Sequence, residues 1–400
     1  MNSKTKLLIL FLLLYALDPL NYGFVFGYLS CLLLASHPFA VKAQFDRIAF
    51  SLFLFSAIYA VFYAMKPSLG AQFIVIYALI PTTLYISGKI LFKEISNDLR
   101  AFWFLVLLGF TFSLPGMISV VMDILEYGFV KTKRDVPNIW TGDLQSATNM
   151  AAGFALNMCI PGFLIINRKI LYSRGGLLIL GGIYLISLLC VLRLGSRTQI
   201  ALSLFTLVVA IFYKMGKQNI KKNIGLFALI FIGVNVAISY VTLDTNSELL
   251  SAYADRADSK TNGAASAGGR TGRWEKSFEQ MFKDPLGWDV EEFGFSHNLW
   301  LDATRVGGLL SLFLLMLFTI SSIKKVLQLY RLHPKPRLFD GQLILYCTSF
   351  MLSFFVEPIL EGYFILFSLF CLILGMLNSY IESEIQAAHK LEEPLIQKTP

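Results

Sequence analysis

The sequence predicts an all-α, polytopic membrane protein with about 12 transmembrane helices. Three observations support this fold class: the composition, the recurring apolar runs and the distribution of basic residues. Of the 400 residues, 56% are apolar and only 15% are charged, whereas a soluble domain has about 45–50% and about 25%. A spanning helix needs about 20 mainly apolar residues, and such runs recur along the whole chain.

The apolar runs give the expected elements in chain order. The first run is short and lacks a small-residue cleavage site, so we expect a retained anchor rather than a removed signal peptide. The five cysteines lie in or beside the runs without metal-like spacing, which favours a packing role. The expected spans are residues 7–17, 20–36, 48–65, 71–92, 101–123, 144–166, 176–192, 198–213, 224–243, 298–323, 341–357 and 362–381.

Basic residues set the predicted orientation, because Lys and Arg near span ends are retained in the cytoplasm. With the N-terminus inside, 21 of the 34 basic residues fall on short cytoplasmic segments. The net charge of +8 is then mainly a topology signal, and no nucleic-acid partner is expected. The expected parts are an N-terminal bundle of about nine spans, an external loop, the C-terminal spans and a cytoplasmic tail, at residues 1–243, 244–297, 298–381 and 382–400.

The segment 244–297 is the one long polar loop, predicted to be external and to lie between the ninth and tenth spans. Long loops in compact membrane proteins are commonly functional, and a tolerated insertion is the alternative. Near its end, an apolar stripe recurs at helical spacing and predicts a short amphipathic helix on the membrane surface or over a cavity. The stripe consists of Trp274, Phe278, Met281 and Phe282.

Candidate site residues gather on the predicted outer face. They are Ser196 and Arg197 at the end of the seventh span, Arg270, Arg273 and Trp274 in the loop, His297, Asn298, Asp302 and Arg305 at the start of the tenth span, and Glu357 and Glu361 between the last two spans. Among the four histidines, this topology places only His297 outside.

These residue types suit transfer from a lipid pyrophosphate to an alcohol. Arginine forks match phosphate oxygens in bidentate fashion, and fixed cations stabilise a leaving pyrophosphate. A histidine that accepts the hydroxyl proton typically contributes ~10²–10⁴-fold. The sequence contains neither a Gly-rich phosphate loop nor a paired-Asp metal motif, so no cofactor and no metal are expected.

The ordered motifs resemble those of the O-antigen polymerase and O-antigen ligase superfamily of bacterial envelope glycosyltransferases. The resemblance covers about residues 176–325, and the N-terminal half matches in hydropathy alone. The shared elements, in order, are Ser196-Arg197, Gly269-Arg270 with Trp274, Pro285 with Gly287, His297-Asn298 with Trp300 and Leu301, and Gly307-Gly308.

The resemblance implies an inverting, metal-independent transfer from an undecaprenyl-pyrophosphate-linked glycan, in a fold similar to the C-type glycosyltransferases. It places the protein in lipopolysaccharide or other polysaccharide biosynthesis, in the bacterial inner membrane with a periplasmic active site. By position, Arg197 and Arg270 are expected to bind pyrophosphate, and His297 is expected to activate the acceptor hydroxyl.

One departure from the family concerns the position nine residues after the histidine, where many members have an acidic residue. Here that residue is Val306, so the role of the acid does not transfer. Arg305 precedes it, two turns into a span, where an unpaired charge is costly. We therefore expect Arg305 to face a hydrated cavity or a carboxylate such as Glu357 or Glu361.

Each assignment has a structural alternative. Arginines at span ends also snorkel to lipid headgroups, histidines cap helices, tryptophans pack, and carboxylates mark turns. These alternatives stay open for Arg193 and Arg197, for Arg270 and Arg273 as solvated loop charges, for His297, for Trp274, for Asp302, and for Glu357 and Glu361. Asn149 and Asn157 are expected to bond between helices.

Within the superfamily, two activities remain open. A polymerase extends one lipid-linked glycan with units from another, whereas a ligase moves the finished glycan to the lipid A-core. Polymerases often have two arginine-rich periplasmic loops, and the basic loop 124–143 (Lys131, Lys133 and Arg134) favours a polymerase. The expected partners are the lipid-linked donor, a glycan or lipid A-core acceptor, membrane lipids and a chain-length regulator.

Two other classes remain as alternatives. A flippase for lipid-linked glycans, or another secondary transporter, usually has ionisable groups near the membrane midplane and related halves. This sequence has no evident internal repeat, and its candidate residues gather at one surface. A non-catalytic envelope scaffold is the last alternative.

Overall fold

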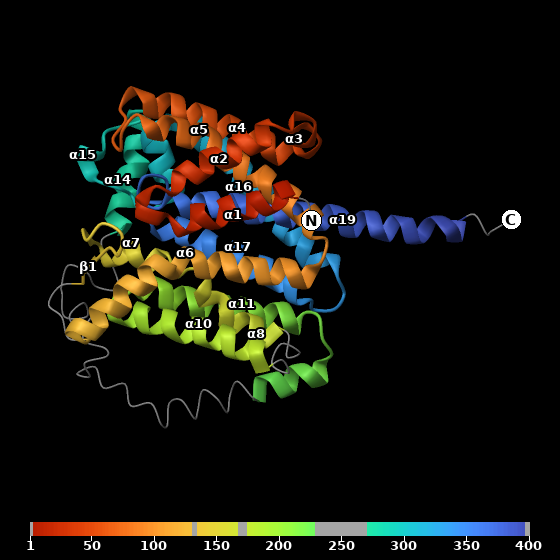
Figure 1. Cartoon of the computed structure of the whole chain (residues 1–400). Helices are drawn as coiled ribbons and strands as arrows, with labels where there is room; N and C mark the ends of the chain where they lie inside the picture. Colours follow the sequence, from red (N-terminus) through yellow and green to blue (C-terminus); the bar gives the residue numbers. More distant parts are fainter. Residues whose placement is uncertain (1–2, 130–133, 167–173, 229–269, 397–400) are drawn as a thin grey trace. The chain divides into compact units, whose positions relative to one another are not determined.

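The computed structural model describes residues 3–129, 134–166, 174–228 and 270–396, and these are predominantly helical (Figure 1). Among them, eight helices are long and apolar enough to cross a membrane. The protein is therefore a multi-pass α-helical membrane protein. The eight helices are α4 (Arg47–Met65), α5 (Gln72–Ile95), α6 (Asp98–Tyr127), α10 (Arg174–Arg193), α11 (Arg197–Met215), α16 (Leu299–Leu332), α17 (Leu338–Val356) and α19 (Phe364–Ile396).

The expected N-terminal spans take a different form. The first run becomes α1 (Ser3–Leu17), which has 15 residues, fewer than a full crossing usually needs. The second becomes α2 (Gly23–Ala35), followed by α3 (Pro38–Gln44) at a bend of 98°, and this pair counts as one further span at most. The expected span 224–243 and most of the predicted loop 244–297 lie outside the described residues. The number of 12 spans stays a prediction.

The expected span at residues 144–166 is wrong as a single helix. The chain there forms a short antiparallel strand pair followed by broken helical segments, with the i→i+3 backbone bonds Gly153 to Met150, Phe154 to Ala151 and Ala155 to Ala152 at the break. A hydropathy window averages the hydropathy of the side chains, so it does not detect a turn within an apolar segment. The elements are β1 (Val136–Pro137), β2 (Leu144–Gln145), α7 (Ala147–Ala152), η2 (Asn157–Cys159) and α8 (Ile160–Ile166).

The chain forms two compact units. Unit 1 comprises residues 1–108, 272–332 and 354–400, and unit 2 comprises residues 109–271 and 333–353. The remaining elements are short, and most of them belong to unit 1. They are η1 (Pro19–Asn21), α14 (Arg270–Lys283, whose first two residues fall to unit 2), α15 (Val290–Phe293) and α18 (Ile359–Gly362).

The core of unit 1 is the pair of helices α5 and α19, which pack against each other. A side chain at Gly88 of α5 would collide with the carbonyl of Leu372, and one at Gly375 of α19 would collide with the carbonyl of Tyr85. The two glycines thus face the partner backbone reciprocally. Small residues at such points let membrane helices approach closely.

A partly buried polar network connects this helix pair to α4. Lys89, whose side chain is 3% exposed, donates to Asp46 Oδ2 at 2.6 Å and to Glu382 Oε1 at 2.9 Å. Asn378 donates to the same Asp46 oxygen at 2.7 Å. The other oxygen, Asp46 Oδ1, caps α4 by accepting from the N–H groups of Ile48 and Ala49. The network therefore joins α4, α5 and α19.

Unit 2 is held by polar contacts between its helices. Asn157 Nδ2 donates to Ser113 of α6 at 2.7 Å and to Ser187 of α10 at 3.1 Å, so the expected interhelical role of Asn157 is confirmed. Asn149 is exposed. Arg193 forms a 2.5 Å ion pair with Asp123, and both side chains are 1% exposed. Snorkelling to headgroups, one alternative for Arg193, is therefore wrong.

Candidate functional site

The segment that leads into α16 holds His297 in an unusual backbone conformation. His297 has φ +54°, in the left-handed region that non-glycine residues rarely adopt. Asp302, in the first turn of α16, accepts the backbone N–H of Ser296 at Oδ1 (2.8 Å) and that of Asn298 at Oδ2 (3.2 Å). Both neighbours of His297 are thus fixed by one buried carboxylate. Backbone strain kept by such contacts is typical of functional sites.

Asn298 caps α16. Its Oδ1 accepts the backbone N–H groups of Trp300 and Leu301, both at 3.2 Å, which satisfies N–H groups that lack an intrahelical partner. The helix therefore begins directly after the histidine, and the backbone of His297 is fixed at the boundary. Asn298 thus has an observed structural role, and its expected role in substrate binding stays a prediction.

Helix α14 supports the same segment from a second direction. Trp274 Nε1 donates to the carbonyl of Ser296 at 2.9 Å, and the hydroxyls of Ser277 and Ser296 lie 2.6 Å apart. Arg273 Nη1 donates to the carbonyl of Phe295 at 3.3 Å. Trp274 is thus a packing residue that also bonds to the segment, and Arg273 extends a cation to within two residues of His297.

The predicted amphipathic helix is confirmed as α14, but its apolar stripe is divided between two sides. Met281 is buried in a cluster with Trp288 and Leu301, against which Trp274 packs. Phe278 and Phe282 are 54% and 77% exposed. The buried side of α14 includes Ser277, which the spacing of the aromatic residues did not predict. This serine is buried because its hydroxyl bonds to that of Ser296.

Two carboxylates from the turn between α17 and α19 meet the start of α16. Glu357 Oε2 lies 4.0 Å from His297 Nδ1, with side-chain exposures of 3% and 25%. Glu361 forms a buried ion pair with Arg305 and accepts a hydrogen bond from Ser68 Oγ at 2.7 Å. Arg305 thus has a carboxylate partner, as expected, and its guanidinium also lies 5.4 Å from the centre of the Phe295 ring.

The two glycine motifs of the sequence contact each other. Helix α16 is broken at Gly308 (φ +63°, ψ −169°), and the residues around Pro285 and Gly287 replace the lost helical bonds. Leu309 N–H donates to the Pro285 carbonyl, and Trp288 N–H donates to the Arg305 carbonyl, both at 2.9 Å. A Cβ at Gly308 would lie 2.5 Å from the Pro285 oxygen. Gly287 and Gly308 are therefore required for the turn at residues 285–287 to pack against the break in α16.

Ser196 and Arg197 belong to unit 2. Ser196 precedes α11 without a side-chain capping bond, and Arg197 is the first residue of that helix. Arg134 donates to the carbonyl of Leu194 at 2.6 Å and 2.8 Å, so the turn before Ser196 is fixed by a cation from the basic loop. Arg270, the first residue of α14, is half-buried and lies one helical turn before Trp274, on the same side of the helix.

Sequence reasoning missed Ser68 and the ion pair between Lys66 and Asp289. These contacts join the turn after α4 to Glu361 and to the start of α15. The partners are more than 200 positions apart in the chain, and no local pattern marks them. Ser277 was also missed, because a serine within a helical stripe usually indicates an exposed side.

The arrangement is suited to proton transfer next to fixed cations. The His297 imidazole is partly exposed, and the buried Glu357 carboxylate, 4.0 Å away, could stabilise a protonated ring through its charge. Arg273 bonds to the Phe295 carbonyl and Arg305 lies 5.4 Å from the centre of the Phe295 ring, so two cations lie close to this segment. In the described part of the chain, no group of three or more His, Cys, Asp or Glu residues is arranged to hold a metal ion.

No protein-family model matches this chain, and the curated proteins include no match to it.

Proposed function

We propose that the protein is a membrane glycosyltransferase that uses an undecaprenyl-pyrophosphate-linked glycan as donor at the periplasmic face of the bacterial inner membrane. The observation that carries the proposal is the fixation of His297. Asp302 fixes the backbone on both sides of this residue, and Glu357 lies 4.0 Å from its ring. A general base needs a defined position and a group that stabilises its protonated form.

In the proposed reaction, His297 takes the proton from an acceptor hydroxyl as the oxygen attacks the anomeric carbon of the donor sugar. The new C–O bond forms on the face opposite the leaving group, so the anomeric configuration inverts. The C–O bond to the pyrophosphate breaks, and the undecaprenyl pyrophosphate leaves with the bonding electron pair. The imidazolium then loses its proton to water.

Cations near His297 would stabilise the leaving pyrophosphate. Arg273 is exposed and anchored to the Phe295 carbonyl, which leaves other N–H groups of its fork for phosphate oxygens. Arg305 is buried and paired with Glu361. It would therefore contribute to the electrostatic field of the site and not by direct contact with the pyrophosphate. Arg270 and Arg197 keep the pyrophosphate role that the family resemblance implies.

Within the superfamily, we propose a polymerase, with a ligase as the alternative. The basic loop that favours a polymerase contains Lys131 and Lys133, which lie outside the described residues, and Arg134, which bonds to Leu194 within unit 2. Part of the basic character of this loop therefore serves the fold. The products distinguish the two activities.

The test uses purified full-length protein and an undecaprenyl-pyrophosphate-linked repeat unit, with and without a lipid A-core acceptor. A ladder of products from the donor alone is expected for a polymerase. A single size shift that appears only with the core acceptor would establish the ligase. Absence of product in both reactions, from folded protein, would contradict the transferase proposal and favour a flippase.

A further inference from the structure

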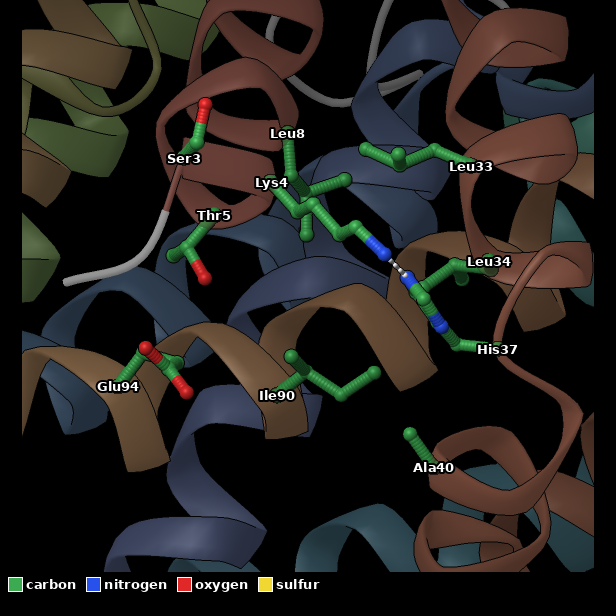
Figure 2. Close-up of a pocket in the computed structure, with 10 residues that line it drawn as sticks. All are labelled: Ser3, Lys4, Thr5, Leu8, Leu33, Leu34, His37, Ala40, Ile90 and Glu94. Atoms are coloured by element: carbon green, nitrogen blue, oxygen red, sulfur yellow. Dashed lines mark hydrogen bonds between the residues drawn. The ribbon is translucent and has the colours of Figure 1, made fainter.

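A cavity of ≈ 580 Å³ lies in unit 1 (Figure 2), and His297 is not among its lining residues. Its walls come from the beginning of α1, the end of α2, the beginning of α3 and the last turns of α5. The apolar part of the lining consists of Leu8, Leu33, Leu34 and Ile90, and the polar part includes Lys4 and His37. The cavity is therefore mainly apolar, and its charged lining residues are Lys4 and Glu94.

Lys4 and His37 are hydrogen-bonded to each other and have further N–H groups that can donate to a ligand. The Lys4 ammonium donates to His37 Nε2 at 2.6 Å, and Figure 2 shows the ammonium directed at the ring. Because Nε2 accepts this bond, the ring proton of the neutral imidazole lies on Nδ1. The pair retains that N–H and two N–H groups of the ammonium, and these donors suit the oxygens of a phosphate.

The position of the cavity relates it to the membrane boundary. Ile90 and Glu94 lie in the last two turns of α5, a candidate membrane span that ends at Ile95. The cavity therefore lies near one end of a candidate span, where lipid headgroups are expected. Basic pockets between transmembrane helices bind phospholipid headgroups in this way.

We propose that this cavity binds a phospholipid, with the phosphate on Lys4 and His37 and the first part of an acyl chain along Leu8, Leu33 and Leu34. Glu94 adds a carboxylate to the same lining, so the proposed phosphate contact rests on Lys4 and His37. The proposal is independent of the transferase reaction, because none of its residues belongs to the His297 site.

The test measures the thermal unfolding of the purified full-length protein in detergent with three added compounds. These are short-chain phosphatidylglycerol, the diacylglycerol with the same chains, and inorganic phosphate. A ligand that binds only the folded state raises the unfolding temperature. We expect a concentration-dependent increase with phosphatidylglycerol, a much smaller one with diacylglycerol and none with phosphate.

Two variants localise the effect. Lys4→Gln should weaken phosphatidylglycerol binding roughly 10-fold, the loss expected for one charge-assisted hydrogen bond. The matched control is Lys6→Gln, an exposed lysine on the same helix that does not line the cavity. Ala40→Trp, at an exposed position on the cavity wall, should occupy the chamber and remove the response without lowering the unfolding temperature of the lipid-free protein.

Three results would overturn the proposal. Equal responses in Lys4→Gln and Lys6→Gln would show that the lipid binds elsewhere. An equal shift with diacylglycerol would show an apolar groove without phosphate recognition. An equal shift with inorganic phosphate would show a free-anion site instead of a lipid site.

Discussion

Asp302 accepts hydrogen bonds from the backbone on both sides of His297, and the histidine has φ +54° between these two bonds. Asp302 lies four residues after Asn298, in the first turn of α16. The same carboxylate therefore fixes both the beginning of the helix and the backbone conformation of His297. Asp302 thus acts as a positioning residue for the proposed base. The sequence left its role open between orienting the imidazole and facing the lumen, and the observed contact is with the backbone.

Replacement of Asp302 by Asn should lower kcat about 10²-fold with little change in KM, because a small misplacement of a catalytic group costs about that much. An amide retains only one acceptor and presents an NH₂ group to a backbone N–H. The measurement is steady-state product formation from the lipid-linked donor, with thermal unfolding as a check on folding. An unchanged kcat would show that Asp302 does not position His297 for the reaction.

Gly308→Ala should destabilise the protein by about 1–3 kcal/mol, the cost of a non-glycine residue in a conformation accessible only to glycine. Its Cβ would also approach the Pro285 carbonyl and Leu286. Gly272→Ala is the matched control, because it lies within α14 with no atom within 4 Å of the added Cβ. Chemical unfolding in mixed micelles compares the two, and equal stabilities would contradict the assigned role of the break in α16.

The pair Arg305 and Glu361 should show strong coupling. Their side chains are 5% and 3% exposed, and removal of one member of a buried ion pair typically costs about 3–5 kcal/mol. Arg305→Met and Glu361→Met should each destabilise strongly, and the double variant should lose much less than their sum. Additive losses in the double-mutant cycle would show that the two charges do not stabilise each other.

Asp46 should make the protein more sensitive to acid. Burial raises the pKa of this carboxyl, but the hydrogen bond from Lys89 and that from the Ala49 N–H lower it, and the net pKa is below its ordinary value. The carboxylate therefore stabilises the fold above the unfolded pKa of about 3.9, and this contribution is lost as pH falls through the folded pKa.

The measurement for Asp46 is the unfolding temperature between about pH 5 and pH 3, the range that brackets its unfolded pKa. Asp46→Asn should be less stable than wild type at pH 5 and should lose less stability over this range. Asp143→Asn, at an exposed position, should follow the wild-type curve. Parallel curves for wild type and Asp46→Asn would exclude the Lys89 network as the source of the acid sensitivity.

Much of the fold was predictable because the hydrophobic requirement of a span is local. The expected spans 48–65, 71–92, 176–192 and 198–213 correspond to α4, α5, α10 and α11 within a few residues. The break at Gly153 was not predictable from hydropathy, because apolar residues continue through the turn. The break in α16 was also not predicted, because Gly307 and Gly308 were noted only as a motif and their contact with Pro285 and Gly287 is not local in the chain.

The sequence indicated which residues are candidates for the site, but it did not indicate most of the contacts between them. The predicted topology and the family resemblance brought His297, Asn298 and Asp302 together as candidates, and the cost of an unpaired charge within a span indicated a carboxylate for Arg305. Which carboxylate it is depends on how α16 and the turn after α17 pack, and that information is not local in the chain. The same reason explains why Ser68, a partner of Glu361, had no sequence signal.

The central claim is that His297 is the base of a glycosyl transfer. The most direct measurement is the transfer rate of purified His297→Ala with the undecaprenyl-pyrophosphate-linked donor, beside wild type and His389→Ala, an exposed histidine on α19. We expect a loss of at least about 10²-fold in His297→Ala, the low end for a general base, with wild-type rates in His389→Ala and unchanged unfolding temperatures. Wild-type transfer by folded His297→Ala would contradict it.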